Sequence, residues 1–366
     1  MKLVVAGGGT GGHLFPGMAV AEAVTKLQPG SDVLFIGTER GLEARAVPAR
    51  GLRLRLIGVH PIKGMGWRGA LRGVASVPRA VLEVRRILAE ERPDLVLGVG
   101  GYASGPAILA ARTCGIPTAV LEQNAVPGLT NRLVGPLVQK AYVTFPESVA
   151  RFPRGKAVVM GNPVRLAFAE RAGAEDPGDG AILVFGGSQG ARALNRLVPR
   201  AMKLAALARP IVHQTGKADL EEVAALYREL GVDADVRPFI DDMAGAVAAA
   251  SLVICRAGAT TLSELCSIGR ASILVPFPYA TDDHQTHNAA SLQAAGASVM
   301  LPEKELTPER LAEVMRRLLA DDSGRRRMAR AALDRGRPGA AGDIARDLLT
   351  LLCEPQPEAM TEAASV

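Results

Sequence analysis

A strand that ends in a glycine-rich turn and leads into a helix begins this chain and occurs again near its middle. Residues 4–12 read VVAGGGTGG, and residues 183–191 read LVFGGSQGA. We predict that helices follow at 18–27 and around 194–206. A strand, a glycine turn and a helix in this order are typical of the first unit of a Rossmann-like sheet. Two such starts in 366 residues predict two sheets, which agrees with about 100–200 residues per domain.

Short apolar and β-branched runs alternate with longer segments of helical period along the whole chain. This alternation predicts an α/β fold with two parallel, doubly wound sheets that are covered on both faces. The predicted strands are 2–6, 33–36, 54–59, 95–99, 118–121, 141–145 and 157–160 in the first half, and 181–185, 210–213, 235–239, 252–255, 272–275 and 298–301 in the second.

The domain boundaries follow from where the second sheet starts. We predict an N-terminal domain at 1–162, a C-terminal domain at 163–337, a helix at 338–353 that can return to the N-terminal domain, and a disordered tail at 354–366. The Gly, Asp and Pro residues of 173–180 fit either a linker or a surface loop.

The cysteine pattern and the apolar runs limit where the chain can act. The four cysteines (Cys114, Cys255, Cys266 and Cys353) are widely spaced and form no C-x-x-C pair, which indicates a reducing compartment without disulfides or a zinc site. The N-terminus lacks the apolar segment of a signal peptide, and no apolar run is long enough to span a membrane. Any membrane contact is therefore expected to be peripheral.

The net charge of +6 is unevenly distributed. Residues 1–162 hold 20 Lys and Arg against 10 Asp and Glu, whereas residues 163–366 hold 23 against 27. The basic half should prefer an anionic partner, and nucleic acid, an anionic membrane and a pyrophosphate substrate all satisfy this condition.

Three strand–glycine–helix junctions can each bind phosphate, since glycine lets the backbone approach a ligand and a helix N-terminus offers free N–H groups. The third reads GVGGYASGP at 98–106.

Gly7, Gly9 and Gly12 also match the dinucleotide fingerprint, with Glu39 after the second strand, so an NAD(P)-dependent dehydrogenase is an alternative. His13 and the repeat of the turn in the second half count against that alternative. No P-loop motif occurs.

Longer motifs make the chain similar to a known family. They lie at 8–17, 100–106, 122–131, 161–165, 186–192, 239–243, 255–264 and 275–288. In this order and spacing the chain resembles the MurG family, the N-acetylglucosaminyltransferases of peptidoglycan synthesis. The resemblance covers about residues 1–350. It implies two Rossmann-like domains facing across a cleft (the GT-B class).

The resemblance also implies a reaction. N-acetylglucosamine would pass from UDP-GlcNAc to the C4 hydroxyl of undecaprenyl-pyrophosphoryl-MurNAc-pentapeptide (lipid I) with inversion, giving lipid II. The N-terminal domain would bind the lipid acceptor and the C-terminal domain the donor. No metal or cofactor is required by this scheme, because helix dipoles and arginine can neutralise the departing pyrophosphate. A UDP-GlcNAc 2-epimerase and a non-catalytic scaffold of the division machinery remain alternatives.

The resemblance assigns residues to each part of the site, and their chemistry agrees. His13 and Glu122 are rival general bases for the sugar hydroxyl. Glu264 suits ribose hydroxyls, Arg165 and Ser188 suit phosphate oxygens, and the Ile240 backbone suits uracil. The full donor-binding set is Thr10, Gly11, Gly12, Asn124, Arg165, Ser188, Ile240, Ala259, Thr260, Thr261, Leu262, Ser263, Glu264 and Gln285. The acceptor-binding set is Gly100, Gly101, Tyr102 and Ser104.

Residues 60–72 interleave apolar and basic side chains and include the only Trp, with Arg79, Arg85 and Arg86 expected on the next helix. Such a segment favours contact with an anionic membrane. The chain would then act as a peripheral protein on the cytoplasmic face of the bacterial cell membrane, where other cell-wall synthesis proteins can be partners. Nucleic acid is not expected, because no nucleic-acid-binding motif accompanies the charge. The predicted membrane residues are Ile62, Lys63, Met65, Trp67, Arg68, Leu71 and Arg72.

Overall fold

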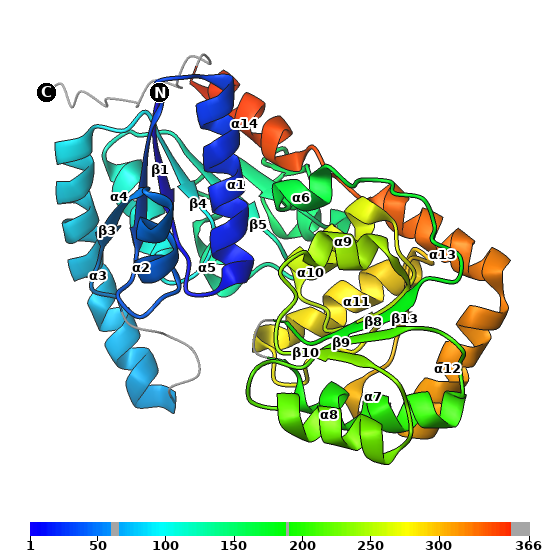
Figure 1. Cartoon of the computed structure of the whole chain (residues 1–366). Helices are drawn as coiled ribbons and strands as arrows, with labels where there is room; N and C mark the ends of the chain where they lie inside the picture. The colour runs from blue at the N-terminus through cyan, green and yellow to red at the C-terminus, as the bar shows by residue number, and fades with distance from the viewer. Residues whose placement is uncertain (60–65, 188–189, 353–366) are drawn as a thin grey trace, which may run out of the picture.

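The computed structural model describes residues 1–59, 66–187 and 190–352, with the backbone alone for residues 66–75. It contains two parallel sheets side by side in space (Figure 1). The N-terminal sheet has the strand order β3-β2-β1-β4-β5-β6-β7, and the C-terminal sheet has the order β10-β9-β8-β11-β12-β13. Every neighbouring pair is parallel, so the predicted fold of two doubly wound α/β domains is confirmed.

The N-terminal sheet is built from almost wholly buried central strands, as a sheet covered on both faces requires. Its strands are β1 (Lys2–Ala6), β2 (Asp32–Gly37), β3 (Arg53–Leu56), β4 (Leu95–Gly98), β5 (Thr118–Glu122), β6 (Lys140–Val143) and β7 (Ala157–Val159). The helices of this half are α1 (Gly11–Leu27), α2 (Glu43–Ala46), α3 (Gly66–Glu91), α4 (Ser104–Thr113) and α5 (Leu129–Val134).

The C-terminal sheet follows the short helix α6 (Leu166–Ala169). Its strands are β8 (Ala181–Phe185), β9 (Ile211–Gln214), β10 (Asp235–Arg237), β11 (Ala250–Cys255), β12 (Ser272–Leu274) and β13 (Val299–Met300). The remaining helices are α7 (Arg192–Ala205), α8 (Leu220–Glu229), α9 (Met243–Ala248), α10 (Ala259–Ile268), α11 (His284–Ala294), α12 (Pro308–Ala320), α13 (Asp322–Arg335) and α14 (Ala340–Leu351).

Every predicted strand overlaps an observed one, but two predicted helix boundaries are wrong. Helix α1 begins at Gly11 instead of residue 18 and contains Pro16, so His13 lies in its first turn. Helix α3 runs from Gly66 to Glu91 and contains Pro78, so Arg79 lies on the same helix as the four predicted membrane residues from Trp67 to Arg72 and not on a following one. A proline inside a helix removes one backbone hydrogen bond and its ring crowds the preceding turn, yet both helices continue through it.

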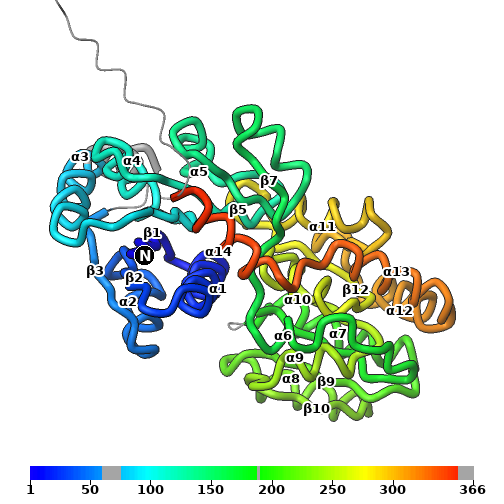
Figure 2. The backbone as a smooth tube through the Cα atoms, turned by 90° about the horizontal axis from the view of Figure 1, so that it is seen from above, coloured from blue at the N-terminus to red at the C-terminus, as the bar shows by residue number. Residues whose placement is uncertain are grey.

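Helix α14 lies against α1 of the N-terminal half, although it follows the C-terminal sheet in sequence (Figure 2). Ile344, Leu348 and Leu351 join the apolar cluster beneath α1. Asp347 of α14 accepts hydrogen bonds from Lys140 Nζ (3.0 Å) and from the Tyr142 hydroxyl (2.7 Å), both on strand β6. The last helix therefore ties the end of the C-terminal half back to the first sheet.

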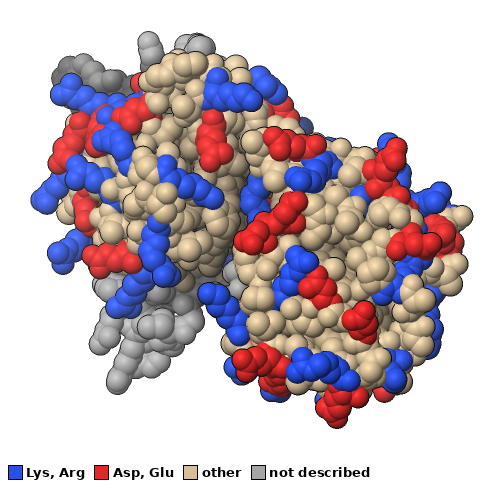
Figure 3. Space-filling view, viewed as in Figure 1, with Lys and Arg blue, Asp and Glu red and all other residues tan. Residues whose placement is uncertain are grey.

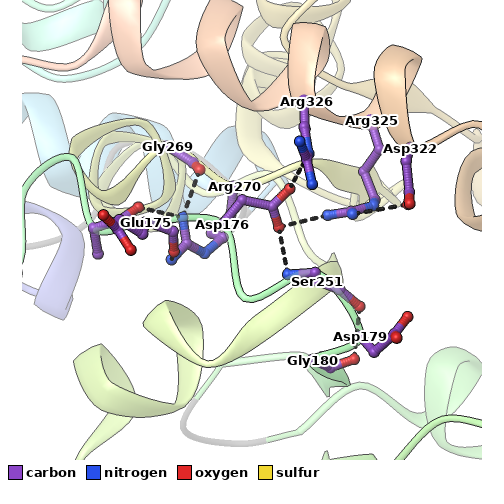
Figure 4. Close-up of polar contacts among 12 residues, drawn as sticks. Glu175, Asp176, Asp179, Gly180, Ser251, Gly269, Arg270, Asp322, Arg325 and Arg326 are labelled. Carbon is purple, nitrogen blue, oxygen red and sulfur yellow. Dashed lines mark hydrogen bonds and ion pairs between the residues drawn. The ribbon is translucent and has the colours of Figure 1, made fainter.

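The segment at 173–180 is bound to the C-terminal domain by two buried arginines (Figure 4). Arg270 donates to the carbonyl oxygens of Ala174 (2.9 Å) and Glu175 (2.7 Å), and Arg325 donates to Asp176 Oδ1 (2.7 Å). Both arginines are at most 2 % exposed. This segment was expected to be either a linker or a surface loop. These contacts favour the surface loop, because a free linker would make none of them.

Within the described residues, no helix is both long enough and apolar enough to cross a membrane.

We predict that replacing Leu348 by Ala destabilises the N-terminal domain by about 2–5 kcal/mol, because it opens a cavity between α14 and α1. The single Trp of the chain, Trp67, lies in this domain, so its fluorescence during urea unfolding reports the change. Leu27→Ala is the matched control, since Leu27 ends α1 and is 43 % exposed. Equal unfolding midpoints for the two variants would contradict the role given to α14.

Candidate active site

A cleft of about 680 Å³ separates the two sheets at the carboxyl ends of their strands. The space-filling view shows the hollow between the two halves (Figure 3). The strand order reverses between β1 and β4 in the N-terminal sheet and between β8 and β11 in the C-terminal sheet. Ligands of open α/β sheets bind at such a reversal. On the face in Figure 3, the acidic and basic side chains of the coloured residues are interspersed over both halves.

Direct contacts hold the two halves together at the cleft, which Asn124 lines. Asn288 of α11 accepts from the Ala125 N–H (2.8 Å) and donates to Asn124 Oδ1 (3.2 Å). Ala125 and Phe145 also belong to the apolar cluster of the C-terminal domain. Asn124, a predicted donor residue, is therefore positioned by the C-terminal domain although it follows a strand of the first.

Pro16 explains a second contact across the cleft. In a helix the N–H of residue 16 would bond to the carbonyl of Gly12, but proline has no N–H. The free Gly12 oxygen instead accepts a bond from the Thr260 hydroxyl of α10 (3.4 Å). The proline in α1 thus leaves an acceptor that links the N-terminal helix to the start of α10.

His13 faces the cleft from the first turn of α1 and is half-buried. Its Nδ1 atom lies 3.0 Å from Gln123 Oε1. On the other side, a Cβ at Gly100 would collide with the imidazole, so only glycine fits there. Burial lowers the pKa of His13 below its ordinary value, although the hydrogen bond to Gln123 acts in the opposite direction. The imidazole is therefore neutral near pH 7 and able to accept a proton.

Glu122, the rival base, is 2 % exposed and does not line the cleft. Its Oε1 accepts from the Asn124 N–H (2.9 Å), and its Oε2 accepts from the Gly128 N–H (3.0 Å) and from Asn131 Nδ2 (2.9 Å). Burial nevertheless raises the pKa of this carboxyl. The carboxylate shapes the loop after β5, and this geometry favours His13 as the base.

Glu43 was not singled out by the sequence, yet it fills the first glycine turn. It is 1 % exposed; Oε2 accepts from the Gly9 N–H (2.7 Å), and Oε1 accepts from the N–H (2.8 Å) and hydroxyl (3.0 Å) of Thr38. A Cβ at Gly8, Gly37 or Gly41 would overlap this side chain. An internal carboxylate thus holds the Gly9 N–H that a phosphate would need. This finding counts against the dehydrogenase alternative, in which the Gly9 N–H would be free for the cofactor phosphate and Glu39 would be the acidic residue of the dinucleotide fingerprint.

The C-terminal wall of the cleft is formed by the start of α10, where Gly258, Ala259, Thr260 and Thr261 line the space. Helix N-termini attract anions because their first N–H groups are free and the dipole is positive. Gln285 lies beside them, and its Oε1 accepts from the N–H groups of Ala257 (3.2 Å) and Phe277 (3.0 Å). The Gln285 amide therefore has only its NH₂ group left for a ligand.

Several predicted donor residues lie outside the cleft lining. Arg165 and Glu264 form a bidentate ion pair (2.6 and 3.0 Å). The two charged groups that were expected to bind the donor therefore bind each other. Ile240 is buried, and its N–H donates to Gln214 Oε1 (2.8 Å), which leaves only its carbonyl for a ligand. Leu262 and Ser263 also do not line the cleft, and the Ser263 hydroxyl bonds within α10.

The predicted acceptor residues divide in the same way. Gly101 and Tyr102 line the cleft, and Tyr102 is 41 % exposed. Gly100 packs against His13, and Ser104 is buried at the start of α4. Among the described residues, the Ser104 hydroxyl has no hydrogen-bond partner.

The remaining predicted residues are placed as follows. Thr10 and Gly12 line the cleft, and Gly11 starts α1 without lining it. Ser188, Ile62, Lys63 and Met65 lie outside the described residues. The predicted membrane residues that the described backbone includes are Trp67, Arg68, Leu71 and Arg72, all in the first half of α3.

Sequence reasoning missed some lining residues that lay within its own motifs. Arg256 lines the cleft and donates to the carbonyl oxygens of Val275 (3.2 Å) and Pro276 (3.1 Å), so it shapes the loop after β12. Its place directly after a buried strand could have identified it. Gln123 and His284 also line the cleft.

The comparison with known proteins is decisive at this point. Residues 3–143 match the glycosyltransferase family 28 N-terminal domain, and residues 181–344 match its C-terminal domain. The chain is 52 % identical over 350 residues to a UDP-N-acetylglucosamine–N-acetylmuramyl-(pentapeptide) pyrophosphoryl-undecaprenol N-acetylglucosamine transferase of Anaeromyxobacter dehalogenans, covering 94 % of this chain and 91 % of the relative. The chain belongs to the MurG family.

Other members and a more distant fold agree with this assignment. The MurG-family transferase of Myxococcus xanthus is 47 % identical over 97 % of this chain and 94 % of its own. The crystal structure of Acinetobacter baumannii MurG is 34 % identical, with a TM-score of 0.81 over 95 % of this chain and 99 % of that one. A UDP-GlcNAc 2-epimerase of Neisseria meningitidis shares 16 % identity and a TM-score of 0.67, which shows a common fold alone. As a MurG-family member the chain is a glycosyltransferase, and the epimerase alternative is not supported.

We predict that Glu43→Ala lowers turnover by at least about tenfold, because the Gly9 and Thr38 N–H groups lose their buried acceptor and the turn before His13 loosens. Added formate should restore part of the activity by refilling the space, and chloride at equal ionic strength should not. The matched control is Glu39→Ala, whose exposed carboxylate should be dispensable. If Glu43→Ala is as active as wild type, the carboxylate does not hold this turn.

Proposed function

We propose that this chain transfers N-acetylglucosamine from UDP-GlcNAc to the C4 hydroxyl of undecaprenyl-pyrophosphoryl-MurNAc-pentapeptide, with inversion at the donor carbon. The family membership supports the reaction. The observation that carries the mechanism is a single cleft in which a neutral His13 on one domain faces the N-terminus of α10 on the other. A base and an anion-binding helix end on opposite walls are what a transfer between an alcohol and a nucleotide sugar needs.

His13 acts as the general base. Its Nε2 takes the proton of the C4 hydroxyl while that oxygen forms a bond to C1 of N-acetylglucosamine. The bond from C1 to the β-phosphate oxygen breaks, and its electron pair leaves with UDP. Such proton transfer contributes about 10²–10⁴-fold to rate. The lowered pKa of His13 keeps the base unprotonated at neutral pH, so activity should fall only as the pH drops below about 6.5.

The donor binds on the C-terminal wall. The first N–H groups of α10 stabilise the charge that develops on the diphosphate. Gln285 donates its NH₂ group to a sugar hydroxyl, and the Ile240 carbonyl accepts from the uracil N3–H. Arg165 and Glu264 are paired with each other in the structure. When Arg165 turns to a phosphate oxygen of the donor, the Glu264 carboxylate becomes free to accept hydrogen bonds from the ribose hydroxyls. Burial raises the pKa of Glu264, and the Arg165 guanidinium opposes this rise.

The acceptor enters over the N-terminal wall. Gly101 and Tyr102 form the cleft edge there, whereas the Ser104 hydroxyl is buried at the start of α4 and does not line the cleft. We place the lipid end of this substrate at an anionic membrane on the cytoplasmic face, with the basic and apolar residues around Trp67 in contact with the head groups. Other cell-wall synthesis proteins would meet the enzyme at the same surface.

The reaction is tested with labelled UDP-GlcNAc, with and without a short-chain lipid acceptor analogue. Label should enter the lipid product only when acceptor is present, and His13→Ala should lower kcat by about 10²–10⁴-fold with the donor KM little changed. The matched control is His287→Ala, because His287 lies one turn along α11 from the cleft edge and does not line it. Failure of the wild-type enzyme to label the acceptor contradicts the function, and full activity of His13→Ala contradicts the base.

The membrane contact is tested separately. The double variant Trp67→Ser, Arg68→Glu should bind anionic vesicles at least about tenfold more weakly, since each basic residue near the surface contributes about 1 kcal/mol. Its turnover of a soluble acceptor analogue should be unchanged. Wild-type and variant proteins that sediment equally with the vesicles would rule out this contact.

A further inference from the structure

Gln123 connects His13 to the end of strand β4 through both ends of its side-chain amide. Its Oε1 lies 3.0 Å from His13 Nδ1, and its Nε2 donates to the Val99 carbonyl oxygen at 3.2 Å. The residue lines the cleft but is only 2 % exposed, so these two hydrogen bonds are largely shielded from water. Gln123 follows the loop-shaping Glu122 directly, and the hydrogen bonds of Glu122 fix the backbone on which the amide sits.

The orientation of this amide follows from the chemistry of its partners. A backbone carbonyl only accepts hydrogen bonds, so the group of Gln123 that faces Val99 must be the NH₂. The oxygen of the amide then faces His13, and an amide oxygen also only accepts. The Nδ1 atom of His13 must therefore carry a hydrogen, and in the neutral imidazole Nε2 has none.

We propose that Gln123 is a positioning residue for the transfer reaction, which selects the Nδ1–H tautomer of His13 and so presents an unprotonated Nε2 to the acceptor hydroxyl. This inference rests on the proposed role of His13 as base. The hydrogen bond from His13 to Gln123 explains why the lone pair of the base lies on Nε2 before the substrate binds.

An amide suits this task better than a carboxylate would. A carboxylate beside an imidazole fixes the same tautomer, but its charge raises the pKa of the ring. Two other ionisable groups shift the pKa of His13. Glu43 of α2 raises its pKa, His284 of α11 lowers it, and the buried carboxylate of Glu122 is occupied by its own loop. The uncharged Gln123 orients the ring without adding a negative charge, and burial can then keep the base neutral.

The pH dependence of kcat/KM tests the inference in the full-length enzyme with a short-chain acceptor analogue. Gln123→Glu places a carboxylate beside Nδ1, so the acid limb of the profile should move to higher pH by about one unit or more. A residue that only supports the fold would lower activity at every pH and leave the limb in place. An unshifted limb in an active Gln123→Glu enzyme overturns the proposal.

A second variant keeps the test decisive if Gln123→Glu folds poorly. Gln123→Met keeps the length of the side chain and removes both hydrogen bonds, so kcat should fall by about 10- to 100-fold with the donor KM nearly unchanged. Gln139→Met is the matched control, because Gln139 also bonds through its amide oxygen, to Thr118, but away from the cleft.

The outcomes separate this inference from the function on which it rests. If His13→Ala is inactive while Gln123→Met keeps wild-type kcat, His13 remains the base and the positioning role of Gln123 is wrong. If His13→Ala is fully active, the proposed base itself has failed, and the role of Gln123 fails with it. Loss of kcat in Gln123→Met together with the shifted limb in Gln123→Glu supports the proposal.

Discussion

Two glycine turns of the N-terminal domain touch each other backbone to backbone, and the catalytic wall of the cleft depends on this contact. The Gly8 N–H donates to the Gly100 carbonyl (3.2 Å), and a Cβ at Gly7 or Gly101 would collide with the opposite turn. Because the turns close on one another, His13 of α1 rests directly on Gly100 and reaches Gln123. These glycines serve the packing of two turns as much as the approach of a ligand.

Buried carboxylates next to the cleft hold the loops of its N-terminal wall in place. Glu43 binds the first glycine turn, and Glu122 binds the loop after β5, each through backbone N–H groups that would otherwise be left without acceptors. An internal anion at such a position fixes the loop without a bound ligand, so the wall that presents His13 is preorganised. The helix N-terminus on the opposite wall, at α10, is where the diphosphate leaves in the reaction that we propose.

Much of the fold could be predicted from the sequence, because alternating apolar runs and glycine turns are local signals. Local signals failed where partners lie far apart in the chain. The pairing of Arg165 with Glu264 and the selection of Glu43 rather than Glu39 depend on how the sheets bring distant segments together. The start of α1 was missed because a proline suggests a boundary, whereas here it frees the Gly12 carbonyl for Thr260. The site motifs identified both walls, but not which atoms remain available to a ligand.

The central claim is that a neutral His13 offers an unprotonated Nε2 to the cleft. Nitrogen-15 NMR of the histidine rings measures this state directly, with the His13 signals assigned from the spectrum of His13→Ala. We expect a neutral ring at pH 7 with its hydrogen on Nδ1 and with no hydrogen on Nε2. A ring that carries its hydrogen on Nε2, or that is doubly protonated at that pH, would contradict the account.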